Sequence, residues 1–413
     1  MPMTSRKGSL DFKFDVAAPA GWSYAAGDTI IGSLVRHTPI VTPEATITLS
    51  LLGRIKTKIT ESKSNNSRTH YRSEALLAKT DQVILSRQPL HLPEGSGAPL
   101  CWEFAVDIPT EPLQSVRQGF TPRTSFVPLD RDHPAHHTLP GSFFSSRDGI
   151  TVSSSGFVEY YLKAQLQYTF KGSSKTVEAI WPFRLNRPVE GTSEQLSKLN
   201  CLSIFQTIQS QRLLPGMQHA DLSLKQKTQK LLGSSKVPKL VFNMRIYHPT
   251  AIQLDNPEPI PIILEILPLP DQTSSSIEDQ SIVINWVRMC LHQRTSVLAP
   301  SNFFTDHAHD DDHPSSVNLN LESAFQHLES PLVMSTGGKG EKKVNIGEMF
   351  QLFFHSNGMV SGFRFLNAVA PIPDFTTYSI QHTNAVEWKV SYSVAGETET
   401  VKASSTLKII AAA

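Results

Sequence analysis

Hydrophobic and polar residues alternate one by one along much of the chain. The clearest case is the segment 45–59, in which one face is apolar and the other polar. The apolar face carries Ala45, Ile47, Leu49, Leu51, Ile55 and Ile59, and the polar face carries Thr46, Thr48, Ser50, Arg54, Lys56 and Lys58. Because successive side chains of a strand point to opposite faces, this period of two predicts a half-buried β-strand.

The same alternation recurs at 10–16, 102–108 and 386–394, and turn-forming residues such as Ala26-Gly27-Asp28 separate the runs. Most of the 28 prolines fall between the runs or at their edges, as expected for residues that cannot donate to a sheet. The best candidate for a helix is 193–212, where Ser193 could cap the first turn, but we favour a non-helical structure there. The pattern predicts an all-β protein with antiparallel sheets, organised as β-sandwiches.

A polar stretch divides the series of expected strands near Asn186. The first series ends at 181–185, and a second resumes by Lys239 at the latest. Loops are expected at 61–72, 111–137 and 301–316, and the last two are long enough to be insertions.

Composition narrows the class of protein. The chain has 413 residues, of which 39% are hydrophobic and 18% charged, enough for two or three domains with real cores. A net charge of +1 argues against a protein that coats nucleic acid, and we expect no nucleic-acid partner. Three cysteines without a CxxC pair indicate a reducing compartment. With no apolar signal sequence or membrane-spanning run, a cytoplasmic location is expected.

Two clusters of histidine and aspartate, at 130–137 and 306–313, contain side chains that can bind transition metals. Neither has the spacing of an established ligand motif, and both lie in loop-like sequence. We interpret them as solvated polar loops and expect no metal and no cofactor. A metal-dependent hydrolase that uses one of the clusters is kept as an alternative.

Motifs for nucleophilic catalysis are absent from the sequence. It contains no GxSxG, and Gly172-Ser173-Ser174-Lys175-Thr176 lacks the spacing of a phosphate-binding loop. We expect no catalytic residues and no enzymatic activity, although a Ser/His/Asp triad assembled in space leaves no trace in sequence order.

A basic stretch at 53–79 offers a candidate binding surface. Seven lysines and arginines against two glutamates give it a net charge of +5. Arg54, Lys56 and Lys58 lie on one face of the expected strand, where they could bind phosphates or anionic lipid headgroups. Lys163, on another expected strand, is a weaker candidate. The alternative is an ordinary solvated sheet face.

Several blocks of the chain resemble arrestins. The segment YAAGDTIIGSLV (24–35) resembles the first strand pair of the arrestin N-terminal domain, and the strand ending at 52–54 resembles the next block. LPGSF (139–143) followed by GFVEYYLKA (156–164), and the close WPF (181–183), fit the same domain. IPDFTTYSI (372–380) with VEWKV (386–390) resembles the C-terminal domain. The style is that of fungal α-arrestins.

The resemblance implies an arrestin-like fold of two antiparallel, immunoglobulin-like β-sandwich lobes. It places an N-terminal lobe at 8–187, a linker or the start of the second lobe at 188–234, and a C-terminal lobe at 235–411. It also implies a non-catalytic adaptor, peripheral at the plasma membrane or endosomes, that binds cytoplasmic tails of transporters or receptors. Such adaptors recruit a HECT-type ubiquitin ligase and promote endocytosis.

The chain departs from that family in one respect, because it contains no PPxY or LPxY motif to bind the WW domains of the ligase. A link to the ligase is therefore expected to be indirect. The alternative function is a retromer-like structural scaffold in protein sorting, which needs no ligase.

Overall fold

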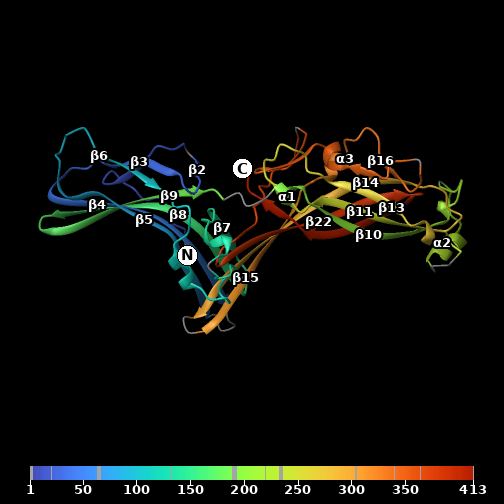
Figure 1. Ribbon diagram of the computed structural model, residues 1–413, viewed down its shortest axis with the longest axis horizontal. Coiled ribbons are helices and arrows are strands. Elements are labelled where there is room, and N and C mark those ends of the chain that lie inside the picture. The colour runs from blue at the N-terminus through green and yellow to red at the C-terminus, as the bar shows by residue number, and fades with distance from the viewer. Residues whose placement is uncertain are drawn as a thin grey trace. The chain divides into compact units, whose positions relative to one another are not determined.

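The computed structural model describes residues 3–19, 21–62, 67–130, 132–187, 193–218, 220–231, 236–302, 305–338, 340–362 and 364–412 (Figure 1). Strands and turns dominate, which confirms the prediction of an all-β protein with antiparallel sheets. Among the described residues, no helix is long and apolar enough to span a membrane.

The chain forms two compact units. Unit 1 contains Met1–Pro188, Thr295–His313 and Phe375–His382, and unit 2 contains Val189–Arg294, Pro314–Asp374 and Thr383–Ala413. The boundary expected near Asn186 is close to the first of these limits. The sequence analysis assigned 295–313 and 375–382 to the C-terminal lobe, whereas both segments pack with unit 1. Alternating polarity predicts that a segment is a strand. It does not predict which of the two units each part of a long strand packs with.

Unit 1 contains two sheets that lie against each other (Figure 1). The smaller has the order β1 (Lys13–Val16), β3 (Thr29–Arg36), β6 (Leu100–Asp107). The larger has the order β2 (Ser23–Tyr24), β9 (Ser173–Leu185), β8 (Val152–Phe170), β4 (Ile40–Ser62), β5 (Arg68–Leu92), and β7 (Phe143–Arg147) also pairs with β8. All these pairs are antiparallel except β2 with β9.

The apolar face predicted on β4 forms the core of unit 1. Ile47, Leu49, Leu51 and Ile55 are completely buried. Gly53 lies on the same face. A Cβ at this position would lie only 2.4 Å from a ring carbon of Tyr160. The fully packed Tyr160 donates its hydroxyl to the carbonyl of Pro140 at 2.7 Å. A larger residue at position 53 would therefore force apart the packed ring and the strand.

The structure differs from two of the three expected loops. The segment 61–72 belongs mostly to the ends of β4 and β5, and 301–316 mostly to β14 (Ser281–Asn302) and β15 (Thr305–Asn318). Both segments are polar although most of their described residues lie in paired strands, β4 with β5 and β14 with β15. In the third segment, 111–137, the described residues form η1 (Gln114–Gly119), η2 (Pro134–His136) and irregular turns, as expected.

Unit 2 is also built from strands. One sheet has the order β10 (Leu199–Gln209), β11 (Lys239–Pro249), β13 (Ile263–Pro268), β17 (Lys343–Asn345). Another contains β14, β15, β16 (Leu332–Ser335), β21 (Phe375–Thr376), β22 (Ile380–Val394) and β23 (Glu397–Thr406), of which 295–313 and 375–382 belong to unit 1. Smaller sheets contain β12 (Ala251–Gln253) with β24 (Lys408–Ile410), and β18 (Leu352–His355), β19 (Gly358–Ser361) and β20 (Arg364–Asn367).

Helical segments in unit 2 are short: α1 (Ser193–Ser197), α2 (Leu224–Leu231), α3 (Glu322–Phe325), α4 (Ile346–Met349), η3 (Gln211–Leu213) and η4 (Pro270–Gln272). The segment 193–212 is thus helical only in its first turn and at 211–212, where η3 begins. Most of it is β10, which makes it the start of the second lobe. Trp388 and Tyr392 are buried in the core, and the Tyr392 ring meets Phe242 edge-on at 5.7 Å.

Candidate functional site

Arg54 is held in a buried ion pair. Its Nε lies 2.5 Å from Oε1 of Glu159 on β8, a carboxylate whose side chain is only 5% exposed. The Arg54 guanidinium also donates to Thr4 Oγ1 at 2.8 Å and lies over the ring of Tyr161. Thr4 donates to the same Glu159 through its backbone N–H at 2.6 Å. This cation is therefore neutralised by the neighbouring strand.

Lys56 is neutralised in the same way from the other side of β4. Its Nζ lies 2.8 Å from Oε1 of Glu74, the residue directly opposite it on β5. Only 11% of the Lys56 side chain is exposed. Two of the three cations of the expected stripe are thus paired with carboxylates on neighbouring strands. We call these two pairs, Arg54 with Glu159 and Lys56 with Glu74, the charge ladder.

Lys163 also has a partner within the sheet. Its Nζ lies 2.9 Å from Oε1 of Glu178 on β9, and Gln165 donates to the same carboxylate at 2.7 Å. The hydrogen bonds from Lys163 and Gln165 lower the pKa of Glu178 to about 2. Because Glu178 is so strongly stabilised as an anion, it keeps Lys163 paired within the sheet. Lys163 is therefore not available to bind a ligand.

Lys58, by contrast, faces another cation. Its cross-strand neighbour is Arg72, and Arg68 stands opposite Ser62 on the same face of the β4–β5 hairpin. None of the three has a carboxylate partner among the described residues. The pKa of His70, opposite Thr60 on this face, is lowered by desolvation and then by the charges of Lys58, Arg72 and Arg68. We call this set, Lys58, Arg68 and Arg72, the cationic hairpin face; Arg68 and Arg72 are exposed and Lys58 is half-buried.

The opposite face of the same hairpin is covered by β14 and β15. Thr57 donates to the carbonyl of Leu298 at 2.5 Å, and the ring of His309 stacks on Tyr71 at 3.6 Å between ring centres. His309 Nδ1 also lies 3.0 Å from Oε1 of Glu61. One face of the hairpin is therefore packed and the other open.

The histidine–aspartate cluster at 306–313 lies on strand β15 and not in a loop. His313 is buried, with Nδ1 2.6 Å from Ser145 Oγ and Nε2 2.6 Å from Ser154 Oγ. Asp311 accepts from Ser154 and pairs with Arg147 at 2.5 Å. Burial lowers the pKa of His313. Both imidazole nitrogens bond to serines, so this network joins β15 to β7 and β8; the side chains of Asp306 and His307 lie outside the described part.

The cluster at 130–137 also contributes to packing. His136 is buried, with Nε2 2.8 Å from the carbonyl of Pro128 and Nδ1 2.8 Å from the hydroxyl of Tyr378. His133 accepts from the N–H of Ala135. Neither cluster brings three or more potential ligands together among the described residues.

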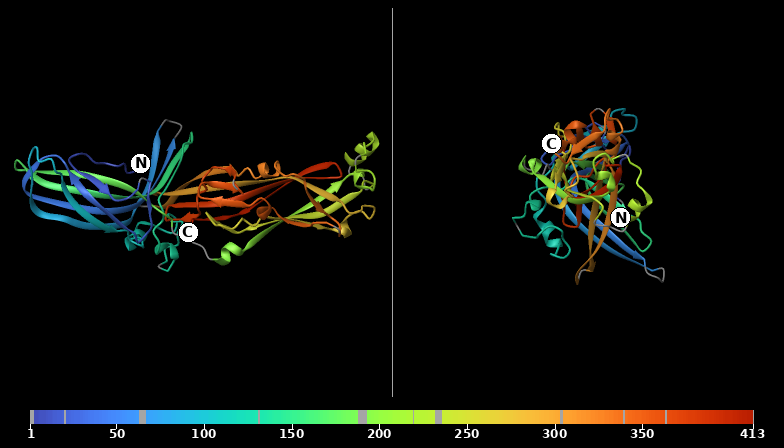
Figure 2. Two further views of the ribbon diagram at one scale, coloured as in Figure 1. Left: turned by 90° about the horizontal axis from the view of Figure 1, so that it is seen from above. Right: turned by 90° about the vertical axis from the view of Figure 1, so that its right-hand side faces the viewer.

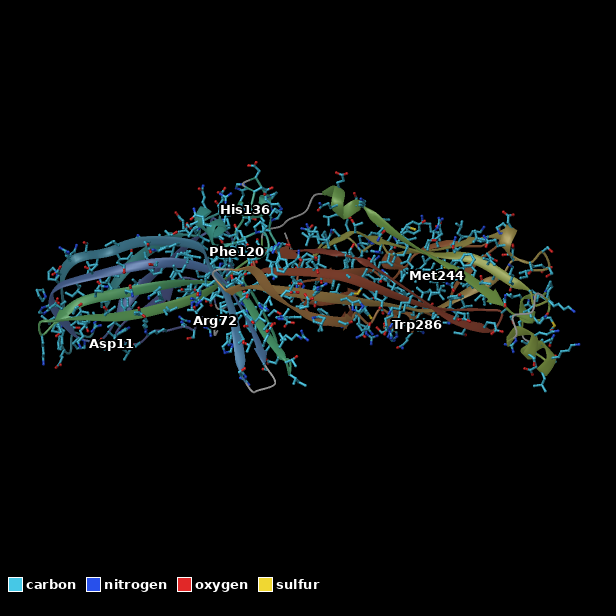
Figure 3. The ribbon with its side chains drawn as sticks, turned by 90° about the horizontal axis from the view of Figure 1, so that it is seen from below. Asp11, Arg72, Phe120, His136, Met244 and Trp286 are labelled. Atoms are coloured by element: carbon cyan, nitrogen blue, oxygen red, sulfur yellow. The ribbon has the colours of Figure 1, made fainter. Side chains whose placement is uncertain are left out.

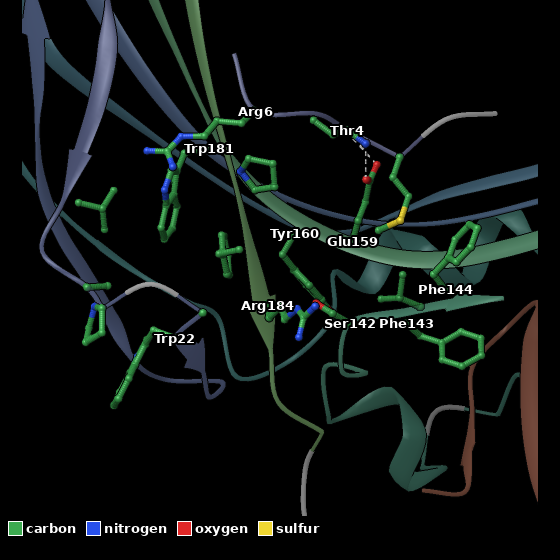
Figure 4. A pocket seen from close by; sticks show the side chains of 18 of the residues that line it. Thr4, Arg6, Trp22, Ser142, Phe143, Phe144, Glu159, Tyr160, Trp181 and Arg184 are labelled. Atoms are coloured by element: carbon green, nitrogen blue, oxygen red, sulfur yellow. Dashed lines mark hydrogen bonds between the residues drawn. The ribbon is translucent and has the colours of Figure 1, made fainter. Parts of the chain in front are cut away.

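A pocket of about 830 Å³ opens at the edge of β9 (Figure 4). Lys7 pairs with Ile180 through two backbone hydrogen bonds of 3.0 and 2.7 Å, and β2 pairs with β9 from Arg184 onward. Pro182 lies between these two pairings and has no N–H to offer. The edge is therefore open at Pro182, where the pocket forms.

The pocket combines aromatic rings with cations. Trp22 is 55% exposed, Trp181 is half-buried, and both line the pocket with Arg6 and Arg184 (Figure 4). Both arginines are exposed and have no carboxylate partner among the described residues. Of the two acids in the lining, Asp15 and Glu159, the second is already paired with Arg54. Such a site suits an anionic group next to an apolar one.

Sequence reasoning missed these four residues, because Arg6 and Trp22 are separated by more than 150 positions from their neighbours on β9. The only signal was a tryptophan in a Pro- and Gly-rich turn, where no core position is expected. Comparison with known proteins gives no further guide: no family model matches the chain, and no curated protein is significantly similar to it.

Proposed function

We propose that the protein is a non-catalytic, arrestin-like adaptor that binds acidic or phosphorylated cytoplasmic tails of membrane proteins and promotes their ubiquitin-dependent endocytosis. The pocket at the edge of β9 carries this proposal, because it joins two arginines that have no acidic partner in the described part of the chain to two accessible tryptophans. The all-β fold and the arrestin-like blocks of the sequence give further support.

The pocket has the chemistry to recognise an extended peptide. Arg6 and Arg184 can bind carboxylate or phosphate oxygens through charge-assisted hydrogen bonds, which are the stronger kind. Trp22 and Trp181 offer large apolar surfaces for a neighbouring aliphatic or aromatic side chain. An acidic segment interrupted by an apolar residue matches both features. Recruitment of a HECT-type ligase then proceeds through another adaptor, since the chain has no WW-binding motif.

A peptide-binding measurement tests the pocket. The probe is a fluorescent peptide, Asp-Glu-Asp-Tyr-Leu-Asp-Glu, with and without phosphate on the tyrosine. Each charge-assisted hydrogen bond contributes roughly 1.5–3 kcal/mol, so the double variant Arg6→Glu/Arg184→Glu should weaken binding at least about tenfold. The matched control, Lys171→Glu/Lys175→Glu, reverses two exposed charges at the other end of β9 and should bind as the wild type does. Equal affinity of both variants would exclude the pocket.

A second candidate function is a structural subunit of a sorting coat. It is favoured by β10, which stands at the end of its sheet and exposes 55% of Phe205 and 38% of Leu199. An edge strand with exposed apolar side chains suits permanent addition of a partner strand. Affinity purification separates the two: transporters with a ubiquitin ligase support the adaptor, and stoichiometric coat subunits lost on Phe205→Lys support the scaffold.

A further inference from the structure

The open face of the β4–β5 hairpin carries three cations that have no carboxylate partner among the described residues. Lys58, Arg68 and Arg72 lie on one face by register, and Figure 3 marks Arg72 on the hairpin. In the sequence, residues 63–67 between the two strands read Lys-Ser-Asn-Asn-Ser and contain no acid. The acidic neighbour Glu61 lies on the opposite face, where it bonds to His309. The three cations therefore lie on one face of the hairpin, and the nearby carboxylate of Glu61 lies on the other.

An apolar side chain stands at the same end of the sheet. Ile150, in the turn between β7 and β8, is 98% exposed. This turn lies beside the β4–β5 hairpin (Figures 2 and 3), and the N–H of Ser62 donates to the carbonyl of Thr151 at 2.8 Å. The hydrogen bond fixes the turn next to the cationic face. A fully exposed isoleucine is unfavourable in water and favourable in the interfacial region of a bilayer.

We propose that this end of unit 1 docks on an anionic membrane surface, with the cationic hairpin face against the lipid headgroups and Ile150 inserted among the acyl chains. The charge complementarity of three cations selects an anionic surface, and the apolar tip selects a bilayer over a soluble acidic chain. This contact uses residues separate from the pocket at β9 and stands whether or not that pocket binds cargo.

The expected strength follows from the charges. A Lys or Arg near an anionic leaflet contributes about 1 kcal/mol, or roughly a fivefold change in affinity. Three such residues give about a hundredfold preference for anionic over neutral vesicles. Asp148, in the same turn as Ile150, and Asp310, exposed on β15, oppose binding and reduce that figure. Salt should weaken the association because Arg68 and Arg72 are solvent-exposed.

Vesicle co-sedimentation of the full chain tests the proposal, with phosphatidylcholine alone and with phosphatidylcholine containing about a third phosphatidylserine. The wild type should sediment at least about tenfold more with the anionic vesicles. Lys58→Glu/Arg68→Glu/Arg72→Glu should abolish the preference. The matched control Lys175→Glu/Lys225→Glu/Lys239→Glu, which makes the same change in net charge at exposed sites elsewhere, should keep it.

Ile150→Asp provides an independent variant, since a turn residue so exposed can be changed without disturbing the core; it should lower vesicle binding severalfold. Equal sedimentation of wild type with both vesicles, or no loss in either variant, overturns the proposal. So does full competition by the soluble acidic peptide, which would identify a peptide surface. Arg6→Glu/Arg184→Glu should leave vesicle binding intact, so failure of the pocket and failure of the membrane contact can be told apart.

Discussion

Two parts of one strand face carry the same residue types and play different roles. Towards the middle of β4, Arg54 and Lys56 meet Glu159 and Glu74 at 2.5 and 2.8 Å and are shielded from solvent. At the hairpin end of the same face, the half-buried Lys58 meets Arg72 across the strands and has no carboxylate partner among the described residues. A row of cations on a strand is therefore available for binding only where the neighbouring strands place no carboxylate opposite it.

The largest effect is expected from breaking the buried part of the ladder. Glu159→Ala leaves the largely buried Arg54 guanidinium with only the half-exposed Glu74, 3.4 Å away, as a partner, which should cost an unfolding free energy at the lower end of about 3–5 kcal/mol. Urea denaturation followed by circular dichroism measures the loss. Glu44→Ala is the matched control, because its pair with Arg87 is more than half exposed on both sides and should cost no more than about 1 kcal/mol. Equal losses in both variants would contradict the distinction drawn here.

A buried histidine, His382, differs from these ion pairs because it stays uncharged in the folded chain. His382 is 2% exposed, stacks on Phe375 and bonds to Thr295 Oγ1 at 2.8 Å. Burial, helped by the charge of Arg187, lowers its pKa to about 4. The unfolded chain has the ordinary value of about 6.5, so it binds a proton first as the pH falls. His382 therefore stabilises the fold fully above pH 6.5, and this contribution is lost progressively towards pH 4.

The difference in pKa corresponds to at most about 3 kcal/mol, at about 1.36 kcal/mol for each pH unit. The measurement is the unfolding free energy of wild type and of His382→Asn between pH 4 and 7.5. The difference between the two curves removes the contribution of the other buried histidines, which both proteins share. The variant should show the weaker dependence on pH. Parallel curves would mean that His382 titrates equally in the folded and unfolded chain.

Lys58→Glu should have a small and opposite effect at the hairpin end. It replaces a repulsive pair with Arg72 by an attractive one, which should raise the unfolding free energy by a few tenths of a kcal/mol. Arg54→Glu, four residues earlier on the same face, should destabilise by several kcal/mol because it sets two buried carboxylates together. Lys58→Glu should also raise the pKa of His70, measurable by NMR titration, since one of the charges that depress it is removed.

A similarly small effect is expected at Lys163. Its pair with Glu178 is about 30% exposed on both sides, and such pairs contribute at most about 1 kcal/mol. Lys163→Ala should therefore change the unfolding free energy very little, while the pKa of Glu178 rises because its main hydrogen-bond donor is lost. A loss as large as that of Glu159→Ala would place Lys163 in the structural part of the ladder.

The sequence by itself determined the all-β class, the register of buried and exposed positions on β4 and the break between the lobes. These follow from alternation and turn chemistry, which are local properties of the backbone. It misjudged the polar hairpin ends as loops, because composition alone does not distinguish solvent-exposed strands from turns.

Only the tertiary structure decided which charges are free and where the pocket lies. Glu74, Glu159 and Glu178 come from other strands, so their pairing with the candidate cations depends on sheet register. Likewise, Arg6 and Trp22 meet Trp181 and Arg184 only after the N-terminal segment pairs at Ile180 and Pro182 leaves the edge of β9 open. Charge and aromaticity are written in the sequence, but their availability to a ligand depends on contacts between residues far apart in it.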